Sequence, residues 1–476
     1  MTQTTPELDT SVADGSLVSD LSSTTRADRI RLILLIFFIA LGVRLAYTVA
    51  LGWRDYQLVA DAQDYHFIAQ ALSDGQGFSR LGWDLAWRPT AFRPPLTPFL
   101  ISLVYQVSPT NTLAARIMMC VIGALTAVMI AVAAVSAFPG RNKWRIGLVA
   151  GIGAALYPYL VIHSTSLLIE PVHALLVPVL LVMTLRAKRP VTIRMAIALG
   201  IVTAIIALNR PDGASYALLA TIWVVTLGSS GFGLAAARRI LLGALVLLSF
   251  IAVISPWWIR NYATFNTFIP STTSTGDLIL GANNPATYEP GVFYGYWSYE
   301  AVITGEAGAY SFADEVTADR KHTELGLNHI ADHPLGYVAV MPIRVLRGWE
   351  LWDPLGNARF GTSWGRPLWA GHIALVLYYP VLVAAIAGAI MARRRWRDLA
   401  PLYAIPAYVT LLFAFITGEM RYRAAVEPVL VIFAAYALVT VADRRKKRGE
   451  IASSGSSAGF AEVRDPLRPD LADSED

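Results

Sequence analysis

Two carboxylates and three arginines in this chain are of the types that activate a hydroxyl group and bind a phosphate. Asp61 and Asp64 lie three residues apart, Arg93 precedes two prolines, and Arg421 and Arg423 follow a Gly-Glu pair. A carboxylate can accept the proton of an attacking hydroxyl as a general base. The planar guanidinium of arginine can bind two phosphate oxygens at once. The sequence therefore points to chemistry at a hydroxyl and a phosphate.

The two carboxylates also have a structural interpretation. After Asp61, apolar residues recur at helical spacing from Tyr65 to Leu72, and the pattern ends at Gly75. Asp61 could cap a short helix on the membrane surface, with Asp64 in its first turn complementing the helix dipole. Capping and catalysis both stay open for these residues.

Each arginine likewise has an alternative role at a membrane surface. Arg93 could extend its guanidinium to the water interface, or bind a lipid phosphate beside the prolines that fix its backbone. Arg260 and Asn261 follow two tryptophans of an expected aromatic belt and are candidates for the same site. Of Arg421 and Arg423, one could pair with the neighbouring acid while the other faces the cavity.

Two further polar residues lie near apolar stretches. His163 could bind a metal or a sugar, or be merely interfacial. Glu170 is a candidate functional residue because an unpaired charge is costly to bury in a membrane, although it could instead close a helix end. The chain has no HExxH motif, no EF-hand loop and no cluster of Cys and His. A divalent cation is thus possible but would need Asp61, Asp64 or scattered ligands, and no cofactor is certain.

The composition indicates whether the chain folds in water or in a membrane. Of its 476 residues, 55% are hydrophobic and only 15% are charged, which is too apolar for a typical soluble globule. The net charge of +5 comes from short basic patches between apolar stretches, so it indicates membrane topology and not nucleic-acid binding. The single cysteine, Cys120, cannot form a disulfide within this chain. The chain is therefore predicted to be an integral membrane protein.

Ten apolar stretches predict transmembrane helices. They cover about 30–53, 112–138, 146–161, 167–185, 192–208, 214–228, 238–256, 367–391, 399–416 and 424–441. If each crosses once, the basic residues at 141–145, 186–189, 238–239, 393–395 and 444–448 all face one side. An excess of Lys and Arg marks the cytoplasmic side, so both termini are predicted to be cytoplasmic.

The same pattern divides the chain into five parts. These are a disordered tail at 1–25, a membrane module at 26–256, an exterior region at 257–366, membrane helices at 367–442, and a basic then disordered tail at 443–476. Within the module, 54–111 is an exterior loop whose stretch Pro94 to Val107 is expected to be interfacial or re-entrant, because counting it as a span would invert every later loop. A helix is expected at about 312–333.

The order of motifs resembles the GT-C superfamily of membrane glycosyltransferases. The residues that carry the resemblance are Asp61 to Tyr65, Arg93-Pro94-Pro95-Leu96, Ser166 to Pro171, Asn209-Arg210-Pro211, Pro256 to Asn261 and Arg421-Tyr422-Arg423. The branch it resembles contains the protein O-mannosyltransferases and the aminoarabinose transferases of lipid A. In that branch an acidic pair opens the first outer loop, and a Pro-Pro-Leu segment opens an interfacial helix. Where the branch has Asp-Glu, this chain has Asp61-Ala62, and its second carboxylate is Asp64.

The resemblance implies an all-α polytopic fold and a site on the outer face of the cytoplasmic membrane. The donor would be a sugar on a polyprenyl phosphate, and the acceptor an envelope glycan, glycolipid or protein. Asp61 would be the base, with Asp64 as the alternative, and attack opposite the leaving phosphate would invert the anomeric centre. The implied donor-phosphate and substrate contacts are Tyr65, Arg93, His163, Glu170, Arg260, Asn261, Arg421 and Arg423. A lipid-linked sugar flippase or another transporter is the alternative. The candidate site charges gather at the outer ends of the predicted spans and no repeat is evident, which favours an enzyme.

Overall fold

The computed structural model describes residues 25–52, 57–81, 85–187, 190–228, 235–305, 307–308 and 314–459, with side chains up to residue 448. The predicted N-terminal tail, apart from Thr25, and the last part of the C-terminal tail lie outside these ranges. The described part is almost wholly helical, with one pair of short strands. The all-α prediction is therefore confirmed.

The first loop predicted to be exterior and the helices before and after it come first in the chain. These elements are α2 (Arg26–Ala50), α3 (Asp61–Ser73), β1 (Ser79–Leu81), β2 (Trp87–Pro89), α4 (Leu96–Val107), α5 (Thr112–Ala137), α6 (Lys143–Leu156), α7 (Pro158–His163), α8 (Glu170–Arg186), α9 (Ile193–Asn209), the 3-10 turn η2 (Pro211–Gly213), α10 (Ala214–Thr226) and α11 (Ala236–Phe265).

The second region predicted to be exterior and the last apolar helices follow. They are α12 (Thr275–Ala282), α13 (Pro285–Tyr288), α14 (Glu300–Ile303), α16 (Glu315–Asp332), α17 (Pro334–Gly348), α18 (Pro354–Phe360), η3 (Gly361–Trp364), α19 (Leu368–Ala392), η4 (Arg393–Arg395), α20 (Ala400–Phe415), η5 (Met420–Ala425) and α21 (Glu427–Gly459). The predicted exterior helix is present as α16. Beyond the predicted span 424–441, α21 continues as a helix into the basic segment.

Helices occupy all ten stretches predicted to cross the membrane. Among the described residues, four helices are long and apolar enough to cross a membrane, judged by length and composition alone. They are α2, α5, α11 and α19 with η4. The count of ten crossings stays a prediction. The 12 residues of α4 give a helix of about 18 Å at 1.5 Å per residue. Since the hydrocarbon core is about 30 Å thick, α4 is too short to cross it.

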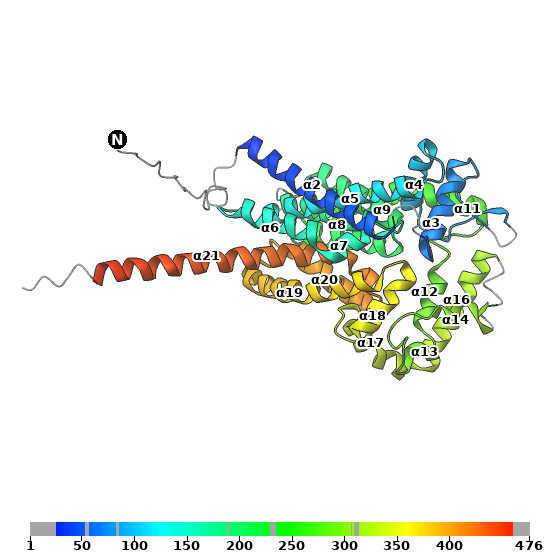
Figure 1. Ribbon diagram of the computed structural model, residues 1–476. Coiled ribbons are helices and arrows are strands. Elements are labelled where there is room, and N and C mark those ends of the chain that lie inside the picture. Colours follow the sequence, from blue (N-terminus) through cyan, green and yellow to red (C-terminus); the bar gives the residue numbers. More distant parts are fainter. Residues whose placement is uncertain are drawn as a thin grey trace, which may run out of the picture.

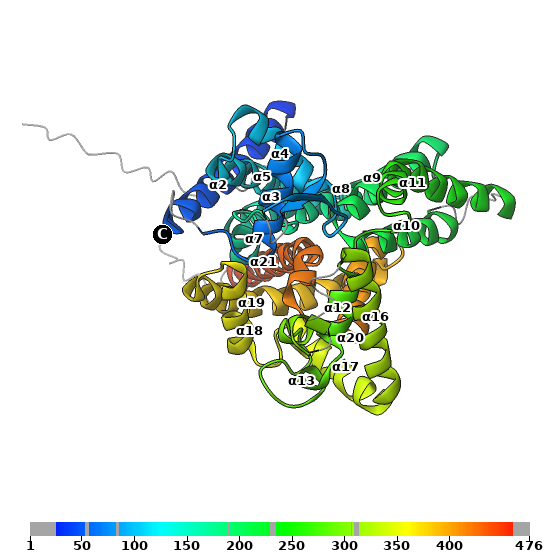
Figure 2. The ribbon, with the colours of Figure 1, turned by 90° about the vertical axis from the view of Figure 1, so that its right-hand side faces the viewer.

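The long helices form one bundle with two different ends (Figure 1). The beginning of α2 and the end of α21 lie at one end, and α21 extends beyond its neighbours. The elements α3, α12, α14 and α16 gather at the opposite end. Figure 2 looks onto that second end and shows α3 and α4 on one side and α12, α13 and α16 on the other. The two exterior regions predicted from sequence therefore lie at the same end.

Basic residues from separate loops meet at the other end of the bundle. Arg145 forms an ion pair with Asp443 at 2.5 Å. Arg186 donates to Ser136 Oγ at 2.7 Å, and Arg395 donates to the carbonyl of Ala137 at 3.2 Å. Contacts of this kind are possible only if these loops share one side, as the charge pattern predicts for the cytoplasmic side.

This arrangement predicts the outcome of cysteine labelling. In a Cys120→Ala background, Gln76→Cys and Glu289→Cys, both at exposed positions, should react with an impermeant thiol reagent on intact cells, whereas Lys447→Cys should react only after lysis. The reason is that the first two positions lie at the end predicted to be exterior and the third at the basic end. Labelling of Lys447→Cys on intact cells, with Glu289→Cys silent, would invert the topology.

Small residues let the helices of the core approach closely. Gly200 in α9 lies against the backbone of Val246 in α11, and Gly388 in α19 lies against the backbone of Phe433 in α21. A Cβ at either glycine would overlap the facing carbonyl oxygen. Helices in membranes associate through this kind of close contact, because lipid offers no hydrophobic drive between them. The core is accordingly rich in alanine.

One predicted span, 146–161, is broken near its end, and a buried arginine binds the carbonyls around the break. Pro158 lacks an N–H group, so it cannot bond the carbonyl of Ala154 one turn earlier, and the chain divides into α6 and α7. Arg44 of α2, fully buried, donates to the carbonyls of Ala155 at 3.3 Å, Ala154 at 3.5 Å and Leu160 at 3.5 Å. This contact ties α2 to the break and explains a charge inside the bundle.

Candidate active site

Asp61 is the first residue of α3, and its carboxylate lies between two arginines. Ala60 before it has φ +48° and ψ −130°, an uncommon conformation for a residue with a side chain, and caps the helix without a side-chain hydrogen bond. Arg93 donates to Asp61 Oδ1 at 2.5 Å, and Arg421 donates to Oδ2 at 2.7 Å. Asp61 therefore does not cap its own helix, and the capping interpretation does not describe it.

The second carboxylate shares one of these arginines. Asp64 Oδ2 accepts from Arg93 Nη2 at 2.8 Å and from its Nε at 3.0 Å. Asp64 Oδ1 accepts from Arg80 Nε at 2.9 Å. Arg80 reaches this position because β1 pairs antiparallel with β2, with Arg80 opposite Arg88. Asp64 is thus held from both sides, and its bonds to Arg93 orient the guanidinium that also binds Asp61.

Arg421 connects Asp61 with an acid on the other side of the site. Its Nε donates to Glu170 Oε1 at 2.5 Å, and its guanidinium lies 4.3 Å from the ring centre of Trp364. Glu170 is fully buried at the start of α8, so it is paired as a buried charge must be. Residues 61, 170 and 421 are brought together here by the fold.

The charges around Asp61 decide its protonation. Burial by itself raises the pKa of Asp61, but Arg93 and Arg421 outweigh burial and hold the pKa below its usual value. Asp61 is therefore ionised at neutral pH. Because the pKa is lowered in the folded protein, this pairing stabilises the fold above the usual pKa of Asp, and the stabilisation is lost as the pH falls.

Several predicted site residues lie away from Asp61. Arg423 pairs with Glu427 at 2.6 Å in a second buried group and lies over the ring of Tyr378 at 4.0 Å. Arg421 and Arg423 thus both pair with acids, and a role of either one in a cavity stays a prediction. Tyr65 is buried on α3 with its ring 5.7 Å from the guanidinium of Arg93.

Arg260 and Asn261 belong to a clamp that holds the backbone before Arg93. Arg260 donates to the carbonyls of Thr90 at 2.6 Å and Phe78 at 2.8 Å, and to Asn261 Oδ1 at 3.0 Å. From α16, Glu315 accepts from the Thr90 hydroxyl and from the Ala91 N–H, each at 2.6 Å. Residues of α11 and α16 therefore hold the backbone at Thr90, three residues before Arg93.

The clamp leads to a prediction about Glu315. Glu315→Ala should lower the thermal unfolding midpoint and reduce transfer about tenfold, because two hydrogen bonds to a carboxylate are lost, each contributing about 1.5–3 kcal/mol. Glu324→Ala on the exposed side of the same helix is the matched control and should change neither measurement. Unchanged transfer by the Glu315 variant would contradict a role of the clamp in placing Arg93.

His163 contacts an arginine that the sequence analysis did not single out. Arg366 Nη2 donates to His163 Nδ1 at 3.1 Å, so this ring nitrogen is unprotonated. Arg366 is 8% exposed, and among the described residues no carboxylate lies within ion-pair distance of it. Its sequence context, an Arg-Pro pair at the outer end of an apolar stretch, is the signal shared with Arg93 and could have identified it.

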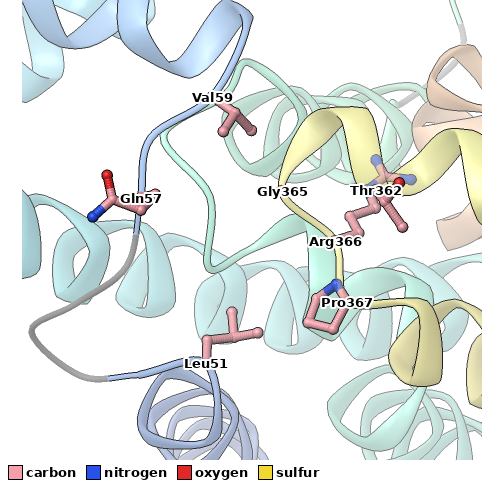
Figure 3. Close-up of a pocket in the computed structure, with 7 residues that line it drawn as sticks. All are labelled: Leu51, Gln57, Val59, Thr362, Gly365, Arg366 and Pro367. Atoms are coloured by element: carbon pink, nitrogen blue, oxygen red, sulfur yellow. The ribbon is translucent and has the colours of Figure 1, made fainter.

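Arg366 lines an open pocket of about 350 Å³. Figure 3 shows Gln57 and Val59 on one wall, the segment from Thr362 to Pro367 on the opposite wall, and Leu51 at the end of α2. Val59 lies two residues before Asp61, and Arg366 lies two residues after Trp364, which contacts Arg421. The pocket is therefore next to the acidic and basic side chains described above.

The acids at this site do not form a metal site as they are arranged. Within the described ranges, no group of three or more His, Cys, Asp or Glu side chains is placed to hold a metal ion. Asp61 and Asp64 instead contact Arg93, and Glu170 contacts Arg421. Activity with and without a chelator tests the divalent cation left open by the sequence.

Comparison with solved structures identifies the fold. The apo crystal structure of the Archaeoglobus fulgidus oligosaccharyltransferase aligns with a TM-score of 0.52 and 12% identity, over 91% of this chain and 52% of that one. Its complex with Zn and sulfate aligns with a TM-score of 0.48 and 15% identity, over 91% and 51%. ArnT from Cupriavidus metallidurans, in the apo state, gives 0.38 and 14%, over 86% and 75%.

This chain therefore spans about half the length of the archaeal oligosaccharyltransferase. No protein-family model and no curated protein sequence matches it. At 12% identity the likeness shows the fold alone, which is the GT-C membrane fold that the order of motifs predicted. The protein is an all-α polytopic membrane protein of this fold.

Proposed function

We propose that this protein transfers a sugar from a polyprenyl-phosphate donor to a hydroxyl of an envelope glycan, glycolipid or protein. The reaction takes place at the outer face of the cytoplasmic membrane, and both termini are cytoplasmic. The observation that supports the proposal most is the position of Asp61. It is an ionised carboxylate between Arg93 and Arg421, next to a pocket that contains a buried arginine without a carboxylate partner in the described chain.

The chemical step needs one base and one leaving group. Asp61 accepts the proton of the acceptor hydroxyl while the hydroxyl oxygen forms a bond to the anomeric carbon. The bond between that carbon and the phosphate oxygen breaks, and polyprenyl phosphate leaves with the electron pair. Attack opposite the leaving group inverts the anomeric centre in one step. A carboxylate with a lowered pKa is a weak base but stays ionised, and it needs to accept the proton only as the carbon–oxygen bond forms.

The phosphate has a specific candidate partner. Arg93 and Arg421 are predicted phosphate contacts, and both already bind carboxylates. Arg366 instead contacts His163 and the sulfur of Met420, and it lines the pocket. A guanidinium in this environment can bind phosphate without giving up an ion pair. We therefore assign the first phosphate contact to Arg366, with Arg93 and Arg421 stabilising charge nearer the base.

The position of the pocket fits a lipid-linked donor. Its lining residue Leu51 follows α2, and Pro367 precedes α19. At the outer ends of these helices, Tyr47 and Trp369 lie with ring centres 5.9 Å apart. A polyprenyl chain could thus remain in the membrane beside α2 and α19 while its phosphate reaches Arg366.

Reconstitution tests this function directly. Purified protein in vesicles should transfer sugar from one of a panel of polyprenyl-phospho-sugars, presented on the outer leaflet alone, and should release polyprenyl phosphate in step with transfer. Movement of intact donor between leaflets, with no polyprenyl phosphate released, would support the flippase alternative and contradict an enzyme.

A further inference from the structure

Three buried polar atoms next to Arg421 have no hydrogen-bond partner in the described chain. They are Oε1 of Glu419, the hydroxyl of Tyr296 and the indole N–H of Trp364. Glu419 is 8% exposed and Tyr296 is 1% exposed. Buried polar groups are nearly always hydrogen-bonded, so several unpaired ones in a single place mark a position where a polar ligand binds.

These three groups share one neighbourhood. Glu419 Oε1 lies 3.9 Å from Arg421 Nη1, which is ion-pair distance but too long for a hydrogen bond. Trp364 lies under the same guanidinium at 4.3 Å. The Gly418 N–H donates to the carbonyl of Gly295 at 3.1 Å, which places Glu419 beside the segment that carries Tyr296.

Arg421 does not hydrogen-bond Glu419, because its guanidinium is oriented by two other carboxylates. Its Nε binds Glu170 at 2.5 Å, and its Nη1 binds Asp61 at 2.7 Å. Burial raises the pKa of Glu419, although Arg421 acts in the opposite direction. A ligand that donates a hydrogen bond to Glu419 would supply what the protein does not.

We propose that Glu419, Tyr296 and Trp364 form a subsite that binds the hydroxyl groups of an uncharged sugar. This proposal rests on the sugar donor proposed above. Sugar hydroxyls can donate to a carboxylate, exchange hydrogen bonds with a phenol and accept from an indole N–H. The subsite is also next to the phosphate contact, since Arg366 reaches the sulfur of Met420, the residue after Glu419, at 3.9 Å.

The charge of the subsite supports an uncharged sugar. Arg421 has three carboxylates around it, those of Asp61, Glu170 and Glu419, at 2.7, 2.5 and 3.9 Å. A sugar that carries its own carboxylate would add a fourth negative charge in a buried place and would be repelled. The subsite therefore discriminates against uronic acids.

The subsite is tested by measuring how tightly wild type and two variants bind sugar donors and polyprenyl phosphate without a sugar. The probes are polyprenyl phosphate, polyprenyl-phospho-mannose, polyprenyl-phospho-arabinose and polyprenyl-phospho-glucuronate. Wild type should bind one neutral donor better than polyprenyl phosphate, and should bind the glucuronate derivative worst. Glu419→Gln and Tyr296→Phe should each reduce this preference about tenfold and leave the affinity for polyprenyl phosphate unchanged. Tyr296→Phe removes only a hydroxyl without a partner, so its fold should be intact.

Glu427→Gln is the matched control, because Glu427 is a buried acid in the same part of the chain whose two oxygens are paired with Arg423 and Tyr157. It should not change the preference for the sugar donor. If wild type prefers a neutral donor and neither Glu419→Gln nor Tyr296→Phe reduces that preference, the subsite is overturned while the proposed function stands. The subsite would also be overturned if wild type bound polyprenyl-phospho-glucuronate more tightly than the neutral donors. No preference for any sugar donor by wild type would instead overturn the proposed donor.

Discussion

Asn in place of Asp61 is expected to reduce sugar transfer by about 10²–10⁴-fold, the usual effect of losing a general base. The amide oxygen of Asn can accept from only one of Arg93 and Arg421, its NH2 group faces the other, and the amide cannot take the acceptor proton. The first phosphate contact is assigned to Arg366, which this change does not touch. Donor binding should therefore change little. The measurement is the single-turnover rate of transfer at saturating donor, with the unfolding midpoint and the donor affinity determined on the same preparation.

Two controls separate catalysis from structure at this position. Asp64→Asn should have a milder effect, because Asp64 acts through Arg93 by two hydrogen bonds and contacts Asp61 only indirectly. Asp74→Asn, at an exposed position just after α3, should have none. If Asp64→Asn is inactive and Asp61→Asn is active, Asp64 is the base. If both transfer at the wild-type rate, neither carboxylate is the base.

Removal of the Arg366 guanidinium is expected to have the second largest effect. Arg366→Ala should weaken binding of polyprenyl phosphate by about 10–100-fold, because a charge-assisted hydrogen bond contributes about 1.5–3 kcal/mol. Transfer at low donor concentration should fall by the same factor and should recover in part at high concentration. Arg366→Lys should restore only part of the affinity, since lysine cannot bind two phosphate oxygens at once.

The matched control for this experiment is Arg359→Ala. Arg359 is an exposed arginine at the end of α18, seven residues away, and its loss changes the net charge equally. Affinity for polyprenyl phosphate should be unchanged in this variant. If Arg366→Ala binds polyprenyl phosphate like wild type, while Arg93→Ala or Arg421→Ala does not, the phosphate binds at the acidic cluster and not in the pocket beside α2 and α19.

Much of the architecture follows from the sequence alone. Apolar composition excludes a soluble fold, and the stretches of low polarity coincide with helices because a backbone in lipid must satisfy its own hydrogen bonds. Asp61 at the start of a short helix is also readable from local pattern, since the apolar residues after it recur at helical spacing. These features depend on residues close together in the chain.

The partners of the site residues were not readable in this way. Arg421 lies 360 residues after Asp61 and 251 after Glu170, and nothing in the local pattern of either acid specifies that contact. Arg260 matched a motif and yet holds the backbone before Arg93, whereas Arg366, in an Arg-Pro pair like that of Arg93, was not singled out and lines the pocket. Which arginine is bound to a carboxylate, and which one lines a pocket without such a partner in the described chain, depends on how helices distant in sequence pack. The sequence by itself determined the membrane helices and the types of reactive residue, and only the tertiary structure decided their pairing, because buried charges are placed by long-range contacts.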